Sequence, residues 1–174
     1  TNRKQLLSLS SKSKKVWGMF AEKAMAYDID RDKENEPSLA EMTAKTLEIL
    51  SSNPKGFVLM VEGSKIDWAS HANDPVGVIH DILAFDEAVK VAKEFAKKNK
   101  NTVVIVMTDH GNGGISIGNS ASDNTYDKLV LDEILQFIKA AKVSGEGLEK
   151  ILSKNTPNDE LRNKVAFNYG ICDL

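Results

Sequence analysis

The sequence predicts an α/β fold of three layers, in which helices cover both faces of a mainly parallel β-sheet. Residues 57–61 and 102–107 are runs of apolar and β-branched side chains, as in strands that are buried on both faces. Between them, apolar side chains of residues 75–99 recur at helical spacing. This order of strand, helix and strand makes the two strands parallel and the crossover right-handed.

The remaining elements follow from local signals. A helix is predicted from Ser38, because Ser38 and Glu41 have capping-box spacing, and it ends near Asn53-Pro54. Asp74-Pro75 combines a capping residue with a first-turn proline and begins the long helix. A strand is predicted at 16–21 and a loop over the sheet edge at 111–122. Further helices are predicted at about 128–141, 145–153 and 157–168.

The bulk composition is typical of a globular domain, since 41% of the 174 residues are hydrophobic and 28% are charged. We expect residues 1–174 to form one domain, with the basic residues 1–15 mobile or on the surface. A net charge of −2 gives no bulk attraction to nucleic acid, and no apolar run approaches the ~20 residues that span a bilayer. The single cysteine, Cys172, excludes an internal disulfide framework.

Both ends of the chain suggest a piece of a longer protein. Thr1 is not preceded by an initiator methionine, no signal-peptide hydrophobic stretch follows it, and the chain stops at Leu174 without a polar tail. A mature chain left by processing is the alternative.

Potential metal ligands follow both predicted strands. Asp67 and His71 are four residues apart, so a helical turn or a tight loop directs both side chains toward one point. Asp109 and His110 are adjacent and can meet one ion only where the backbone bends, as it should just past a strand. Carboxylate and imidazole are normal zinc ligands, whereas Glu62 is a hard oxygen ligand that suits Mg²⁺. Parallel strands would bring all five residues to one sheet edge, where clustered carboxylates without a metal would repel one another.

Four segments around these residues resemble the metal-binding segments of alkaline phosphatases. They are Met60-Val61-Glu62-Gly63, Ile66-Asp67, His71-Ala72 and Thr108-Asp109-His110. The intervening helix, with Phe85-Asp86-Glu87-Ala88, resembles that of the family as well. The resemblance is strong over residues 56–118, and weaker segments lie at 18–21, 37–39 and 113–118.

The resemblance implies an alkaline-phosphatase-like but incomplete fold and a metal-dependent phosphomonoester hydrolase with two Zn²⁺ and one Mg²⁺. It implies that Glu62 is the magnesium ligand, that Asp67 and His71 bind the first zinc, and that Asp109 and His110 bind the second. In such a mechanism one zinc activates a serine nucleophile, and the other stabilises the leaving alkoxide and later activates a water. The substrate would be a phosphomonoester, the full-length protein a homodimer, and the location extracytoplasmic (periplasmic or secreted).

This chain departs from the family pattern in several places. Nothing in residues 1–55 matches the nucleophilic serine, the early aspartate or the phosphate-binding arginine, so no catalytic residue is assigned within the chain. The last zinc histidine is expected beyond Leu174, which leaves about half a site and a chain that is inactive alone. Trp68 stands where some relatives have lysine or histidine, which bears on substrate affinity and pH optimum.

Other interpretations remain open for the function and for single residues. The parent could be a phosphodiesterase, a sulfatase or a metal-dependent phosphoglycerate mutase, with which the run 109–112 is shared, although Glu62 favours the phosphatase. A non-catalytic metal-binding or interaction domain is a third possibility. The proposed ligands could instead be surface carboxylates, turn formers or satisfied histidines, and His80 is interpreted as a helix-surface histidine. Lys65 either orients phosphate or forms a surface ion pair.

Overall fold

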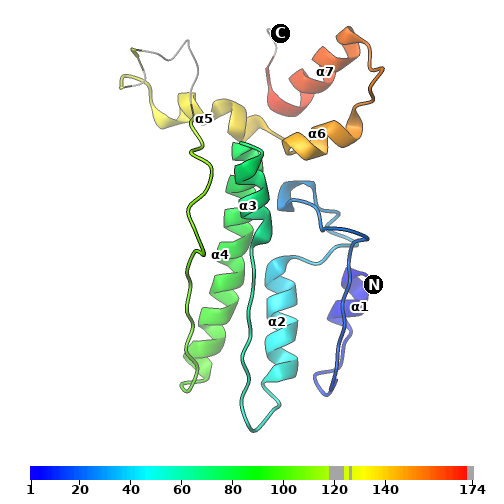
Figure 1. The fold of residues 1–174 in the computed structure, drawn as a ribbon, viewed down its shortest axis with the longest axis vertical. Helices are drawn as coiled ribbons and strands as arrows, with labels where there is room; N and C mark the ends of the chain where they lie inside the picture. Colours follow the sequence, from blue (N-terminus) through cyan, green and yellow to red (C-terminus); the bar gives the residue numbers. More distant parts are fainter. Residues whose placement is uncertain (118–123, 126, 172–174) are drawn as a thin grey trace. The chain divides into compact units, whose positions relative to one another are not determined.

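The computed structural model describes residues 1–117, 124–125 and 127–171, and about half of these residues are helical (Figure 1). The helices, in chain order, are α1 (Arg3–Leu7), the 3₁₀ helix η1 (Asp28–Asp30), α2 (Leu39–Leu50), α3 (Ser64–His71), α4 (Pro75–Lys98), α5 (Leu131–Ala140), α6 (Gly145–Ile151) and α7 (Asn158–Tyr169). Among the described residues, no helix is both long enough and apolar enough to cross a membrane.

The predicted three-layer α/β/α fold with a mainly parallel sheet is wrong for the described part of the chain, which contains no β-strand. Residues 57–61 and 103–107 are extended and run in the same direction, opposite to α4 (Figure 1). Within the described residues they form no backbone hydrogen bond with each other or with another segment. A continuous run of apolar and β-branched side chains favours an extended backbone, but a sheet also needs a neighbouring segment at hydrogen-bonding distance. The predicted strand at 16–21 is likewise irregular.

The chain divides into two compact units. The first contains Thr1–Ser64 and His80–Gly111, and the second contains Lys65–Ile79 and Asn112–Leu174. The described residues do not include 118–123, which make up most of the second half of the predicted loop. They do not include Cys172 either. That residues 1–174 form a single domain stays a prediction.

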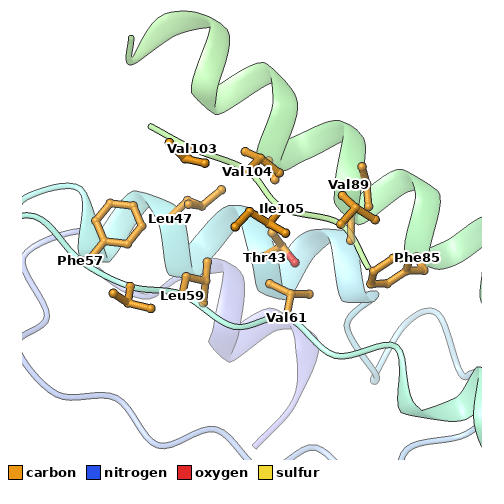
Figure 2. A pocket seen from close by; sticks show the side chains of 14 residues that line it. Thr43, Leu47, Phe57, Leu59, Val61, Phe85, Val89, Val103, Val104 and Ile105 are labelled. Carbon is orange, nitrogen blue, oxygen red and sulfur yellow. The ribbon is translucent and has the colours of Figure 1, made fainter. Parts of the chain in front are cut away.

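In the first unit, α2, α4 and the two extended segments enclose an apolar groove of about 360 Å³ (Figure 2). Leu47 of α2 and Val89 of α4 face it, together with Leu59 of the extended segment (Figure 2). The side chains of 57–61 alternate, so that Val58 is 97% exposed and Met60 82% exposed while their neighbours are partly covered. Alternate side chains of 57–61 thus pack onto the helices, whereas the side chains of 103–107 are all exposed, from 37% at Val104 to 84% at Val103.

Capping interactions define the helices of the first unit. The Ser38 side chain accepts the N–H of Glu41, and the Glu41 carboxylate accepts the N–H of Ser38, which confirms the predicted capping box of α2. α1 contacts α2, with Leu6 buried and the Arg3 guanidinium bonded to Glu41 at 2.5 and 2.9 Å. The first residues of the chain are thus attached to α2 by both apolar and charged contacts.

The second unit is organised around the α3–α4 junction and the start of α6. Ala69 and Ser144 are fully buried, and Val76 is nearly so. The Asp74 carboxylate accepts the N–H groups of Val76 and Gly77, both at 3.0 Å, as the predicted cap of α4. This junction sets the orientation of α3, the helix that carries Asp67 and His71.

Candidate metal-binding site

Asp67 and His71 lie on one face of α3, one helical turn apart. The Nε2 atom of His71 is 3.6 Å from Oδ1 of Asp67. The helix ends just after His71, where Asn73 adopts a left-handed conformation with φ 51°. Both side chains are accessible, since His71 is 71% exposed and Asp67 is 39% exposed. The i, i+4 spacing has therefore produced an accessible carboxylate–imidazole pair.

The loop after the second motif holds Asp67 from another side. The Asn112 side-chain amide donates to Oδ1 of Asp67 at 2.5 Å and to the Asp67 carbonyl at 3.3 Å. All of these groups belong to the second compact unit. No short-range pattern links Asn112 to Asp67, because the two residues are 45 positions apart, and the sequence signal is limited to an asparagine in a glycine-rich run after the Asp-His pair.

Asp109 and His110 form a second pair, at a bend that follows the extended segment. The Nε2 atom of His110 is 3.5 Å from Oδ2 of Asp109, and the His110 N–H donates to Oδ1 of Asp109 at 3.0 Å. The Nδ1 atom of His110 lies 3.0 Å from the Gly111 carbonyl, which can only accept a hydrogen bond. This contact favours the tautomer with the proton on Nδ1 and the lone pair on Nε2.

Glu62 lies in the first compact unit with Asp109 and His110, and it is exposed just after the other extended segment. The two pairs belong to different units. Among the described residues, no three His, Cys, Asp or Glu side chains are close enough to hold a metal ion together. The structure thus assembles two two-residue pairs, one in each unit, and Glu62 belongs to the unit of the Asp109–His110 pair. His80 is half-buried within α4, as expected for a helix-surface histidine.

Lys65 and Trp68 sit beside Asp67 on α3. The Lys65 ammonium is 4.1 Å from the centre of the Trp68 ring and 3.8 Å from the Glu146 carboxylate. The hydrogen bond from Lys150 lowers the pKa of Glu146, and the charge of Lys65 acts in the same direction. Lys65, whose side chain is 12% exposed, thus joins α3 to α6 through its ion pair with Glu146 and its contact with Trp68.

The donor chemistry of the two pairs suits zinc. Two ligands held at about 2.1 Å from a tetrahedral ion are roughly 3.4 Å apart. The nitrogen–oxygen separations of 3.6 Å at Asp67–His71 and 3.5 Å at Asp109–His110 are close to that value. Each pair can therefore supply two of about four ligands without a large rearrangement.

Comparisons with known proteins agree on one family. A sequence model described as alkaline phosphatase matches residues 1–161. The chain is 42% identical over 156 residues to alkaline phosphatase 4 of Bacillus subtilis, covering 90% of this chain and 32% of that protein. It is 55% identical over 74 residues to the alkaline phosphatase of Escherichia coli, covering 42% of this chain and 16% of that protein.

Solved structures extend the similarity to three dimensions. The alkaline phosphatase of Thermus thermophilus superimposes with a TM-score of 0.82 at 26% identity, over 98% of this chain and 35% of that one. A cold-active alkaline phosphatase from a psychrophilic Shewanella species gives a TM-score of 0.76 at 31% identity, over 96% and 38%. The matched region covers about a third of the length of the Bacillus, Thermus and Shewanella proteins, and less of the Escherichia coli protein. Because the family match covers nearly the whole sequence, the chain belongs to the alkaline phosphatase family.

Proposed function

We propose that this chain supplies metal ligands to a phosphomonoester hydrolase, an alkaline phosphatase. The observation that carries the proposal is the pair of carboxylate–imidazole sites, each with a nitrogen–oxygen separation of 3.5 or 3.6 Å, in a chain of this family. Members of the family generally use metal ions. Other hydrolase classes and a purely structural domain have no comparable support among the described residues.

Five residues have roles in this proposal. Asp67 and His71 bind one Zn²⁺, Asp109 and His110 bind a second, and Glu62 binds Mg²⁺. The metal ions, when bound, lower the pKa of a coordinated hydroxyl group and stabilise the charge that develops on the leaving oxygen. The serine nucleophile comes from outside these 174 residues.

The chain's own groups prepare these sites in distinct ways. The helix holds the backbones of Asp67 and His71 one turn apart, so both side chains can reach the same ion. At His110, the Gly111 carbonyl holds the proton on Nδ1 and directs the Nε2 lone pair outward. The carboxylates of Asp67 and Asp109 provide the negative charge that attracts a divalent cation.

The parent protein in this proposal acts on phosphomonoesters as a homodimer in the periplasm or outside the cell, which is the expectation that the family resemblance supports. These properties belong to the whole protein, of which the chain spans about a third in its relatives.

Zinc content after metal loading and desalting tests the ligand assignment. The chain is compared with the double variants Asp67→Ala/His71→Ala and Asp109→Ala/His110→Ala. The matched control, His80→Ala/Asp86→Ala, removes the same two side-chain types from α4. We expect each site variant to retain less zinc than the chain, and the control to retain as much.

Plasma mass spectrometry gives the zinc-to-protein ratio directly. Equal zinc in the chain and in both site variants would contradict the ligand assignment. A loss as large in the control as in the site variants would show that zinc binds non-specifically to surface side chains.

A further inference from the structure

The Asn112 side chain forms two hydrogen bonds with Asp67. Its amide nitrogen is 2.5 Å from Oδ1 and 3.3 Å from the Asp67 carbonyl oxygen. The two residues are 45 positions apart in the sequence, so the contact is a tertiary one. One amide thus holds both the side chain and the backbone of Asp67.

The backbone after Asn112 is shaped to fit against α3. Gly113 has φ 87°, and a Cβ there would lie 3.2 Å from the carbonyl oxygen of Ser70, in the last turn of that helix. Gly114 follows with φ 63°, and its N–H bonds to the Asn112 carbonyl at 3.2 Å. Since L-residues other than glycine rarely adopt such angles, two consecutive glycines let the loop approach α3 and deliver the amide.

The chemical type of this contact matters for a metal ligand. An amide N–H donor fixes the carboxylate's rotation but carries no charge, so the full negative charge of Asp67 stays available to a cation. A lysine or arginine in this place would neutralise the carboxylate. The same Oδ1 atom is 3.6 Å from Nε2 of His71, so orienting the carboxylate also sets the geometry of the pair.

We propose that Asn112 is a positioning residue that holds Asp67 in the orientation in which it binds zinc together with His71. This inference rests on the proposed function, because it takes Asp67 as a zinc ligand. Hydrogen-bonded partners of metal ligands typically change metal affinity by about 10- to 100-fold when they are removed.

The test is the zinc dissociation constant of the chain, measured by competition with a chromophoric chelator. Asn112→Ala removes the amide, and we expect it to weaken zinc binding by about tenfold or more. Asn155→Ala, at another exposed asparagine of the second unit, is the matched control and should leave the affinity unchanged. Asn112→Gln restores an amide on a longer side chain and should recover part of the loss.

A spectroscopic readout separates positioning from general destabilisation. With Co²⁺ in place of zinc, the visible d–d bands report ligand geometry, and we expect them to shift in Asn112→Ala but not in Asn155→Ala. Circular dichroism of each variant shows whether the helices are retained. An Asn112→Ala chain that keeps its helices and still shows the altered bands supports positioning.

The outcomes distinguish this inference from the proposed function. If Asp67→Ala weakens zinc binding and Asn112→Ala does not, Asp67 is a ligand and the role of Asn112 is overturned. If Asp67→Ala binds zinc as the unaltered chain does, the ligand assignment itself fails, and the inference fails with it. Equal losses in Asn112→Ala and Asn155→Ala would also overturn it, because the effect would then not be specific to the Asp67 contact.

Discussion

The Asp74 carboxylate accepts the backbone N–H of Gly145 at 2.7 Å, and it thereby ties the start of α4 to the start of α6. The other carboxylate oxygen accepts the N–H groups of Val76 and Gly77, which are buried residues. One side chain therefore satisfies three backbone donors and anchors the helix junction that follows His71.

Asp74→Ala is expected to lower the free energy of unfolding by about 2 kcal/mol, because a helix cap and a further hydrogen bond are lost together. The free energy of unfolding of Asp74→Asn should lie between those of the unaltered chain and Asp74→Ala, because only the oxygen of the amide can accept a hydrogen bond. Glu149→Ala, at an exposed position on α6, should change stability by less than about 0.5 kcal/mol. Urea unfolding followed by circular dichroism measures all three, and a loss in Asp74→Ala no larger than in Glu149→Ala would contradict the anchoring role.

The Arg3–Glu41 ion pair predicts a pH-dependent contribution to stability. The hydrogen bond from Arg3 is the largest cause that lowers the pKa of Glu41, and partial burial opposes it. Because the folded-state pKa is below the unfolded value of about 4.3, this contribution is present above that pH. It is lost as the pH falls through the folded-state pKa.

Glu41→Gln keeps the capping-box acceptor of α2 but removes the charge. Above about pH 5 we expect Glu41→Gln to be less stable than the unaltered chain, and we expect this difference in stability to disappear at lower pH. Glu87→Gln, which removes an exposed partner of Lys90, should have little effect at any pH. Denaturant unfolding from pH 3 to 7 provides the comparison. If the free energy of unfolding of Glu41→Gln differs from that of the unaltered chain by the same amount at every pH, the ion pair is not the source of the difference.

The open faces of the two extended segments predict self-association. Val103 is 84% exposed and Ile105 77% exposed, on a backbone that has no sheet partner among the described residues. Unpaired, apolar extended segments favour association between chains. Val103→Lys/Ile105→Lys should therefore shift the sedimenting species toward the monomer mass of 19.1 kDa.

The matched control places the same two lysines on a helix, at the exposed residues Ile82 and Leu83 of α4. Sedimentation velocity over a range of concentrations should show little change for this control. A fully monomeric parent chain, or equal effects of the two double variants, would count against association through the extended segments.

Local signals were sufficient to predict α2, α4, α5, α6 and α7, but they did not predict α1 or η1, and they left α3 open between a helical turn and a tight loop. The Ser38–Glu41 capping box and the Asp74-Pro75 start act within one turn, so their consequences do not depend on distant residues. Sheet formation depends on a pairing partner, and the described residues supply none for 57–61 or 103–107. The apolar pattern therefore correctly indicated extended backbone but wrongly indicated a sheet.

The distinction between local signals and contacts with distant residues also applies to the candidate site. The spacing of Asp67 and His71 was informative because the i, i+4 relationship is local to a helix. The bond from Asn112 to Asp67 and the contact of Lys65 with Glu146 join residues far apart in the sequence. Such contacts depend on how a loop or a second helix packs, which no short-range pattern specifies.

Three neighbouring glycines offer a graded test of the loop that carries Asn112. Gly113→Ala adds a Cβ 3.2 Å from the Ser70 carbonyl oxygen at φ 87°, so the loop must move away from α3. Gly114→Ala has backbone strain at φ 63° but open space, and Gly111→Ala has open space without a left-handed angle.

We expect zinc affinity to fall most in Gly113→Ala, because displacement of the loop also displaces the Asn112 amide. Gly114→Ala should lose about 1 kcal/mol of stability with a smaller change in affinity. Chelator competition and thermal unfolding measure the two effects separately, and equal zinc affinity in all three variants would show that the position of this loop does not control the Asp67–His71 pair.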